Sequence, residues 1–308
     1  MSDLRERVPG HALIDELLHQ WDLGTIHVDE RSNGIVIDEE AEGWYRGVLG
    51  ERRVANVLDQ LREPWTVLHS VPVGRGTSDI DHVVIGPPGV FTINTKFSPG
   101  RTVWVAGRNM LVESVKKPYI LNSLAEARRA SNLLTARCGL TVPAIGVIVF
   151  VNPGRMVFKE APGGGEMDPP IRVATDEQLL DVLLTRREFS DEQLARIVDV
   201  ASDPATWHQP PLPSSKGEHI AREFAALEDA VGPRLALPRG SAAIRLAPAL
   251  RGPHGRRYAS GTPQAPRTTP RSRRHPKRSR AERLFAELAF PIAGLIGVWV
   301  WVQMMTAK

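Results

Sequence analysis

Four polar residues stand at alternate positions in the otherwise apolar stretch SDIDHVVIGPPGVFTINTKFSPG, residues 78–100. They are Asp79, Asp81, Asn94 and Lys96. Burying such groups costs free energy unless they are hydrogen-bonded, paired or bound to a ligand. Carboxylate and amide oxygens suit Mg²⁺, and a nearby lysine can neutralise the negative charge that develops on a phosphate. These residue types therefore indicate metal-assisted hydrolysis of a phosphodiester bond.

The spacing of these residues predicts a hairpin of two strands, 80–85 and 90–96, joined by a Gly-Pro-Pro-Gly loop. If Ile85 pairs with Val90 across the loop, the two acids lie directly opposite the amide and the lysine. Side chains alternate along a strand, so all four polar residues are predicted to share one face. The other face is apolar and is predicted to belong to the core: Ile80, Val84, Phe91 and Ile93.

A helix is predicted from Ala41 to Leu61, before the hairpin. Val54 and Leu58 belong to its apolar stripe, and Glu51 projects from the same stripe, three residues before Val54. Glutamate is rarely buried unless it is paired. We therefore expect Glu51 to reach the polar face of the hairpin, although the sequence equally permits a glutamate at the edge of the stripe that reaches solvent.

The elements around the hairpin predict a mixed α/β domain that ends near Ser202. A continuous apolar run at 143–151 is typical of a strand covered on both faces. Other elements are inferred from alternation and from capping boxes: a strand at 65–73, a second hairpin turning at 107–109, a helix from Ser123 to Arg137, a strand at 171–175, and helices after Thr175 and Ser190.

The segments GERRVANVLDQL and DIDHVVIGPPGVFTINTK resemble the nuclease-related domain (NERD) family, a branch of the PD-(D/E)XK nuclease superfamily, over roughly residues 42–155. That superfamily has a Glu on a helix, an Asp on one strand and (D/E)-x-K on the next. Glu51, Asp81 and Lys96 match this pattern directly. Asn94 departs from it, because the active pattern has Glu or Asp there.

The resemblance implies a restriction-endonuclease-like fold, with a mixed central sheet flanked by helices, and a metal-dependent nuclease activity. Asp81 would bind Mg²⁺ or Mn²⁺, with Asn94 as a weak second ligand and Asp79 in support. Lys96 would position water or stabilise the transition state, and Glu51 would assist the metal or the water. Nucleic acid is the implied substrate, DNA ahead of RNA. Arg128 and Arg129, on the later helix, are either phosphate contacts or solvated surface residues.

Asn94 leaves other functions open, because an amide removes a negative charge from a site that depends on charge. The second hypothesis is a catalytically inactive nuclease fold that binds nucleic acid or a protein partner at a membrane. The third is a structural membrane protein that never meets nucleic acid. It is favoured by the charge distribution: the chain carries +4, but residues 251–283 hold eleven Lys or Arg and one acid, so residues 1–250 sum to −6.

The C-terminal part predicts a membrane anchor. Residues 203–283 are rich in Pro and Arg and read as a disordered linker interrupted by one short helix. The next segment, LFAELAFPIAGLIGVWVWVQMM at 284–305, has a single charge, and as a helix it would be about 33 Å long, enough to cross a bilayer. The arginines before it predict that the N-terminal domain lies in the cytoplasm. They could also contact anionic lipid or nucleic-acid phosphates.

Four regions are therefore expected along the 308 residues: an N-terminal extension at 1–40, the α/β domain at 41–202, the linker at 203–283 and a transmembrane helix at 284–305. The single cysteine, Cys138, excludes an internal disulfide and fits a reducing compartment.

Overall fold

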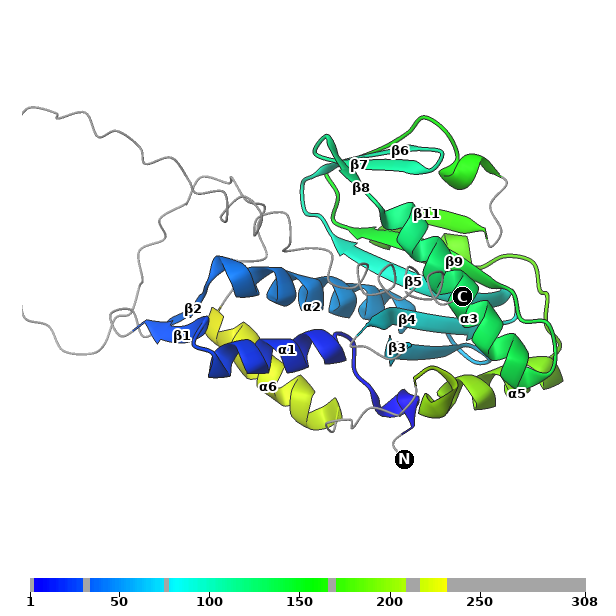
Figure 1. Cartoon of the computed structure of the whole chain (residues 1–308), viewed down its shortest axis with the longest axis horizontal. Coiled ribbons are helices and arrows are strands. Elements are labelled where there is room, and N and C mark those ends of the chain that lie inside the picture. Colours follow the sequence, from blue (N-terminus) through cyan, green and yellow to red (C-terminus); the bar gives the residue numbers. More distant parts are fainter. Residues whose placement is uncertain (1–2, 30–33, 75–77, 166–169, 209–216, 232–308) are drawn as a thin grey trace, which may run out of the picture. The chain divides into compact units, whose positions relative to one another are not determined.

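A computed structural model describes residues 3–29, 34–74, 78–165, 170–208 and 217–231 of the chain. At its centre is a mixed five-stranded sheet in the order β11-β9-β5-β4-β3 (Figure 1). Strands β3 and β5 each run antiparallel to β4, which lies between them, and β5, β9 and β11 run parallel. The bounds of these strands are β3 Thr66–Pro72, β4 Asp79–Gly86, β5 Gly89–Phe97, β9 Ala144–Val151 and β11 Ile171–Thr175. The predicted mixed α/β fold and the predicted hairpin are confirmed.

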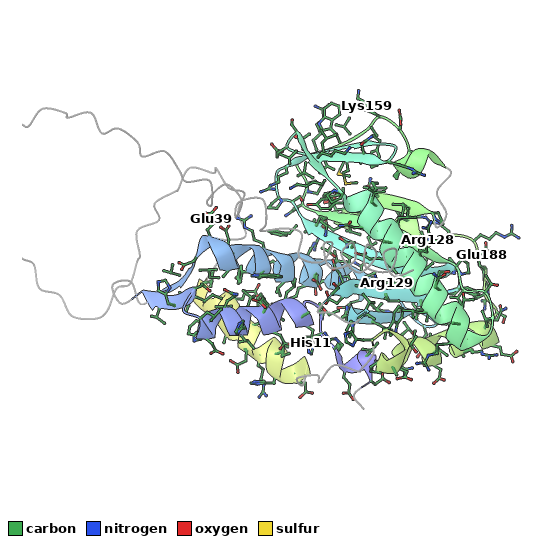
Figure 2. The ribbon with its side chains drawn as sticks, in the orientation of Figure 1. His11, Glu39, Arg128, Arg129, Lys159 and Glu188 are labelled. Atoms are coloured by element: carbon green, nitrogen blue, oxygen red, sulfur yellow. The ribbon has the colours of Figure 1, made fainter. Side chains whose placement is uncertain are left out.

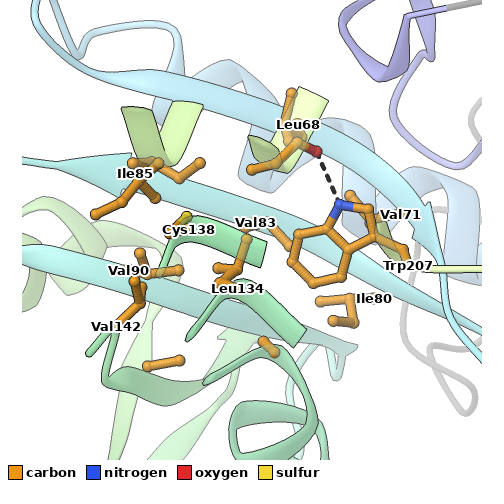
Figure 3. Packing of buried hydrophobic residues seen from close by; sticks show 14 of the residues in the cluster. Leu68, Val71, Ile80, Val83, Ile85, Val90, Leu134, Cys138, Val142 and Trp207 are labelled. Carbon is orange, nitrogen blue, oxygen red and sulfur yellow. Dashed lines mark hydrogen bonds between the residues drawn. The ribbon is translucent and has the colours of Figure 1, made fainter. Parts of the chain in front are cut away.

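Helices cover both faces of this sheet. On one face, α2 (Glu39–Leu58) and the short α4 (Leu179–Leu183) pack on side chains of β4, β5 and β9. On the other face, α3 (Tyr119–Cys138) and α5 (Asp191–Ser202) enclose a second apolar cluster (Figure 3). Trp207 closes this cluster, and its indole Nε1 donates to the carbonyl oxygen of Ala201 at 2.8 Å.

The N-terminal segment packs with a helix from the far end of the described chain. A third apolar cluster joins side chains of α1 (His11–Asp22), α2 and α6 (Gly217–Val231). The paired strands β1 (Ile26–Asp29) and β2 (Gly34–Ile37) lie between α1 and α2 in the sequence. The short helix predicted inside the linker is therefore present as α6. Its Ile220 and Phe224 are buried against Tyr45 and its neighbours.

A smaller four-stranded sheet follows β5, in the order β10-β6-β7-β8. The predicted second hairpin is present here as β6 (Thr102–Ala106) and β7 (Asn109–Val112), with β8 (Val115–Lys117) and β10 (Arg155–Phe158) at the two edges. The inner side chains of this sheet pack on Ile148 and Phe150 of β9 and on Ile120 of α3. This packing fixes the start of α3 beside the end of β5.

Two of the three predicted capping boxes are confirmed, at Thr175 and Ser190. The third prediction was wrong. The helix α3 begins at Tyr119, so Ser123 lies within its second turn, where the side chain is fully buried. The packing of Tyr119 and Ile120 against Phe150 and the smaller sheet starts the helix earlier than the capping signal indicated.

Within the described ranges, no helix combines the length and the apolar character needed to cross a membrane. The predicted transmembrane segment, 284–305, and most of the predicted linker, 203–283, lie outside the described residues.

Candidate functional site

The hairpin has the predicted register only as far as the site. Strands β4 and β5 pair from Gly86–Gly89 through Ile85–Val90 to His82–Ile93, and the register ends there. The next residue of β4 is Asp81. Its carboxylate Oδ2, rather than a backbone carbonyl, accepts a hydrogen bond from the backbone N–H of Thr95 on β5, at 2.5 Å. The predicted direct pairs of Asp81 with Asn94 and of Asp79 with Lys96 are therefore absent from the paired register.

The alternation of side chains between the two faces of the sheet is also interrupted at this point, in both β3 and β4. Leu68 and Val71 of β3 belong to the same apolar cluster, and so do Ile80 and Val83 of β4, although strict alternation would place each pair on opposite faces. Ser70, between the first two, has a backbone φ of 45°, in the left-handed region. The prediction that Ile80 shares a face with Val84, Phe91 and Ile93 was wrong for this reason, because those three belong to the cluster under α2.

The four polar residues consequently come together from different directions. Asn94 and Lys96 project from β5 toward α3, beside Ile148 and Phe150 of the paired strand β9. Asp79 lies beyond the reversal, where the Ser70 side chain and the Arg7 guanidinium act on its carboxyl group. The polar residues therefore surround the point where β4 separates from β5, and the prediction of a single polar face was wrong.

Glu51 is buried on the apolar stripe of α2, as expected, with 4% of the residue exposed. Its Oε2 accepts a hydrogen bond from the backbone N–H of Gly10 at 3.0 Å and one from the Ser70 hydroxyl at 3.4 Å. Burial raises the pKa of Glu51 well above its usual range, and the carboxyl groups of Asp81 and Asp79 raise it further. The alternative of a solvent-exposed glutamate is therefore excluded.

A fourth acid, Glu126 of α3, lies with Glu51, Asp79 and Asp81, and these four residues are called the acid cluster below. The Asn94 side chain donates from Nδ2 to both carboxylate oxygens of Glu126, at 2.9 and 3.1 Å. Sequence analysis missed this residue, because Ser123-Leu-Ala-Glu126 was interpreted as a capping box. The signal that could have found it is the one used for Glu51: Glu126 lies four residues before Ala130, on the edge of the buried stripe of its helix.

The acids of the cluster oppose one another electrostatically. Burial and the neighbouring Asp81 raise the pKa of Asp79 to about 7, and the same two causes raise the pKa of Glu126 to about 7. Burial also raises the pKa of Asp81, while Lys96 and the Thr95 N–H lower it. Lys96 donates from Nζ to the carbonyl oxygen of Thr95 at 2.9 Å and lies 5.1 Å from the ring centroid of Tyr119.

This set of residues fits a hard divalent cation with few protein ligands. Two buried oxygens, Asn94 Oδ1 and Asp79 Oδ2, have no hydrogen-bond partner in the described part of the chain. Among the same residues, no three His, Cys, Asp or Glu side chains converge closely enough to hold a metal by themselves. Mg²⁺ commonly binds through one or two protein oxygens and completes its shell with phosphate and water. The geometry of the described residues is compatible with an open metal site of this kind.

Arg128 and Arg129 lie on α3 two and three residues beyond Glu126, and both are exposed (Figure 2). The guanidinium Nη1 of Arg129 is 3.5 Å from the position that a Cβ would take at Gly74, in the loop before β4. These two cations therefore lie on the helix that carries Glu126, at the outer surface.

The site lies inside a segment that matches a known family. Residues 46–151, about a third of the chain, match the nuclease-related domain family. This match contains Glu51, Glu126 and the four polar residues of the hairpin. The α/β domain of this chain is therefore similar over this segment to nuclease-related domains, and the similarity supports a nuclease-related function. No curated protein and no solved structure matches the chain.

Proposed function

We propose that this protein is a metal-dependent nuclease that hydrolyses phosphodiester bonds in nucleic acid, with DNA as the first substrate to test. The observation that carries the proposal is the gathering of Glu51, Asp79, Asp81 and Lys96 where β4 separates from β5. Acids that raise one another's pKa values are costly to bury together, and such arrangements occur most often at functional sites.

The roles follow from the contacts of each side chain. Asp81 and the Asn94 oxygen would hold Mg²⁺ or Mn²⁺, with Asp79 in support. A bound ion of this kind stabilises charge on the phosphate and lowers the pKa of a coordinated water. Lys96, whose ammonium is held by Thr95, would neutralise charge that develops on the phosphate. Glu51 is held by the Gly10 N–H and would position water.

A second candidate is a catalytically inactive module that binds nucleic acid or a protein partner. Two observations favour it: Asn94 replaces the acid of the active pattern, and the described acids do not converge on one metal position by themselves. In this alternative the same cluster is retained for binding, and turnover is absent under any divalent metal.

The test uses the full chain with labelled single-stranded DNA, double-stranded DNA and RNA, in Mg²⁺ or Mn²⁺ and in chelator. Asp81→Asn and Lys96→Met are compared with two controls at exposed sites, Asp199→Asn and Lys159→Met. A nuclease loses at least about 100-fold in rate in the first pair and nothing in the controls. Equal cleavage by all five proteins would mean that another site or a contaminant is responsible. Binding without cleavage in the wild type establishes the second candidate.

We also propose that the protein is anchored in the cytoplasmic membrane by residues 284–305, with the domain in the cytoplasm. The support is the length and apolar character of the segment and the arginines before it. The full chain should sediment with membranes and be released by detergent but not by high salt. A chain that ends at Arg283 should be soluble. Release of the full chain by salt alone contradicts a spanning helix.

A further inference from the structure

An asparagine in a cation site has a problem of orientation that a carboxylate does not have. Its amide presents an acceptor oxygen on one side and an NH₂ donor on the other, and only the oxygen can bind a cation. An asparagine at this position is therefore a useful ligand only if another group holds the nitrogen. In this chain the strand position that bears an acid in the active pattern is Asn94.

The partner of the Asn94 nitrogen is unambiguous. Nδ2 lies 2.9 Å from Oε1 and 3.1 Å from Oε2 of Glu126, so both oxygens of one carboxylate accept from the same amide nitrogen. When it is ionised, the Glu126 carboxylate only accepts hydrogen bonds. If the amide were rotated by half a turn, its oxygen would face two acceptor oxygens at the same short distances. The hydrogen bonds to Glu126 thus select one of the two orientations.

The selected orientation leaves the amide oxygen for another partner. Asn94 Oδ1 is directed away from Glu126, and it is buried without a hydrogen-bond partner in the described chain. Such groups are rare in folded proteins, and each calls for an explanation such as an ion. Lys96 lies two residues along β5 on the same face as Asn94, and the charges of Asp81 and Lys96 both act on Glu126. The Asn94–Glu126 pair therefore lies beside Asp81 and Lys96.

We propose that Glu126 is a positioning residue that holds the amide of Asn94 with its oxygen available to a divalent cation, so that the Asn94–Glu126 pair replaces the single strand carboxylate of an active nuclease. When Glu126 is ionised, the pair keeps the negative charge of that carboxylate and moves it one hydrogen bond away, onto α3. The asparagine at position 94 then does not abolish the cation site, because its neutral oxygen is the ligand and Glu126 supplies the charge. This inference rests on the proposed function for the identity of the ion, Mg²⁺ or Mn²⁺.

The test is a double-mutant cycle on Mn²⁺ affinity, measured by calorimetry on the full chain. The variants are Glu126→Gln, Asn94→Asp and the two combined, with Glu192→Gln, at an exposed position of α5, as the matched control. Glu126→Gln keeps the size of the side chain but can also donate to the amide oxygen, so the selection is lost. In the Asn94 background we expect Mn²⁺ to bind about 10-fold to 100-fold more weakly, the range seen for groups that orient metal ligands.

In the Asn94→Asp background the same change should have little effect. The strand then carries a carboxylate that needs no orientation, and glutamine can donate to it. The combined variant should therefore bind Mn²⁺ within about twofold of the Asn94→Asp variant. An equal loss in both backgrounds would show that Glu126 acts only through its charge, and no loss in either background would show that it has no role; both results overturn the proposal. Thermal unfolding of each variant identifies any that fail to fold, and the combined variant tests the idea independently of the single ones.

Cleavage assays on the same proteins separate this inference from the nuclease function. Coupled Mn²⁺ affinities without any cleavage support the positioning role and refute the nuclease. Cleavage by the wild type with equal losses in both backgrounds refutes the positioning role alone. A wild-type protein that binds no Mn²⁺ overturns the positioning role, because a correctly oriented oxygen then has no ion to bind.

Discussion

Asp79 provides the sharpest test of whether the acid cluster is a strained functional site. The residue as a whole is partly exposed, but its carboxyl oxygen Oδ2 is buried with no hydrogen-bond partner in the described chain, and Asp81 lies close enough to oppose its ionisation. Burial and Asp81 raise its pKa from 3.8 to about 7, against the opposing effects of Arg7 and Ser70. Asp79→Asn removes the charge and keeps the size and an acceptor oxygen.

The sign of the effect follows from linkage. A carboxyl group whose pKa is higher in the folded than in the unfolded protein favours folding at low pH, and this contribution is lost as the pH rises through the folded value. For Asp79 the loss occurs between about pH 4 and pH 7. The shift of about three pKa units corresponds to at most about 4 kcal/mol at pH 8. Relaxation of the neighbouring acids reduces this, so we expect Asp79→Asn to stabilise the protein by about 1 to 3 kcal/mol at pH 8.

The assay is thermal and urea unfolding of the wild type, Asp79→Asn and the exposed control Asp199→Asn, at pH 4.5 and pH 8, in chelator. The stabilisation should be large at pH 8, small at pH 4.5 and absent in the control. Added Mg²⁺ should stabilise the wild type at pH 8 more than Asp79→Asn, because a cation relieves the repulsion that the substitution removes. If Asp79→Asn is neutral or destabilising at pH 8, the carboxyl group is well solvated or well paired, and the reasoning about a strained acid cluster is refuted.

Two further predictions concern the rest of the domain. Phe224→Ala should destabilise the protein by about 3 to 5 kcal/mol in urea unfolding. The reason is that Phe224 of α6 is 2% exposed and its ring centroid lies 5.6 Å from that of Tyr45. A loss of stability below about 1 kcal/mol would mean that α6 is not part of the folded domain. Burial lowers the pKa of His69 to about 4, and its Nδ1 lies 2.9 Å from Nδ1 of His82, so the two nitrogens share one proton in a hydrogen bond. NMR titration should find His69 neutral at pH 5.5, and the stability of the protein should fall as the pH drops from 6.5 toward 4. Titration of the His69 ring near pH 6.5 would contradict the buried pair.

The elements that sequence analysis predicted correctly depend on local signals. The Gly-Pro-Pro-Gly loop determines the register of β4 and β5 beside it, and Ile85 pairs with Val90 as expected. The spacing of Glu51 from Val54 and Leu58 places all three on one stripe of α2, whatever the rest of the fold does. The capping boxes at Thr175 and Ser190 likewise involve only residues three apart.

The reversal of faces at Ser70 could not be predicted in this way. Serine rarely adopts a positive φ, and nothing near Ser70 in the sequence requires it. The conformation is held from a distance: Arg7 donates to the Ser70 carbonyl oxygen, the backbone N–H of His11 donates to its hydroxyl, and that hydroxyl donates to Glu51. These partners lie between 19 and 63 residues away along the chain.

Glu126 was missed for a different reason, a competing local signal. Ser-x-x-Glu is the pattern of a capping box, and the pattern holds at Ser123 in sequence although the helix begins four residues earlier. The start of α3 is determined by the packing of Tyr119 and Ile120 against Phe150 and the smaller sheet, which are contacts between distant elements. A pattern of three or four residues cannot distinguish a helix start from a buried position inside the helix.

The contacts of the acid cluster also show that the site extends beyond the family match. Residues 46–151 contain every acid of the cluster, but two of the groups that make those acids tolerable come from the N-terminal segment. The Gly10 N–H lowers the pKa of Glu51, and the Arg7 guanidinium lowers the pKa of Asp79. Without that segment both acids would lose a compensating partner while keeping their repulsive neighbours. Arg7 and Gly10 are therefore structural parts of the candidate site, because they oppose the rise in pKa that burial causes in Asp79 and Glu51.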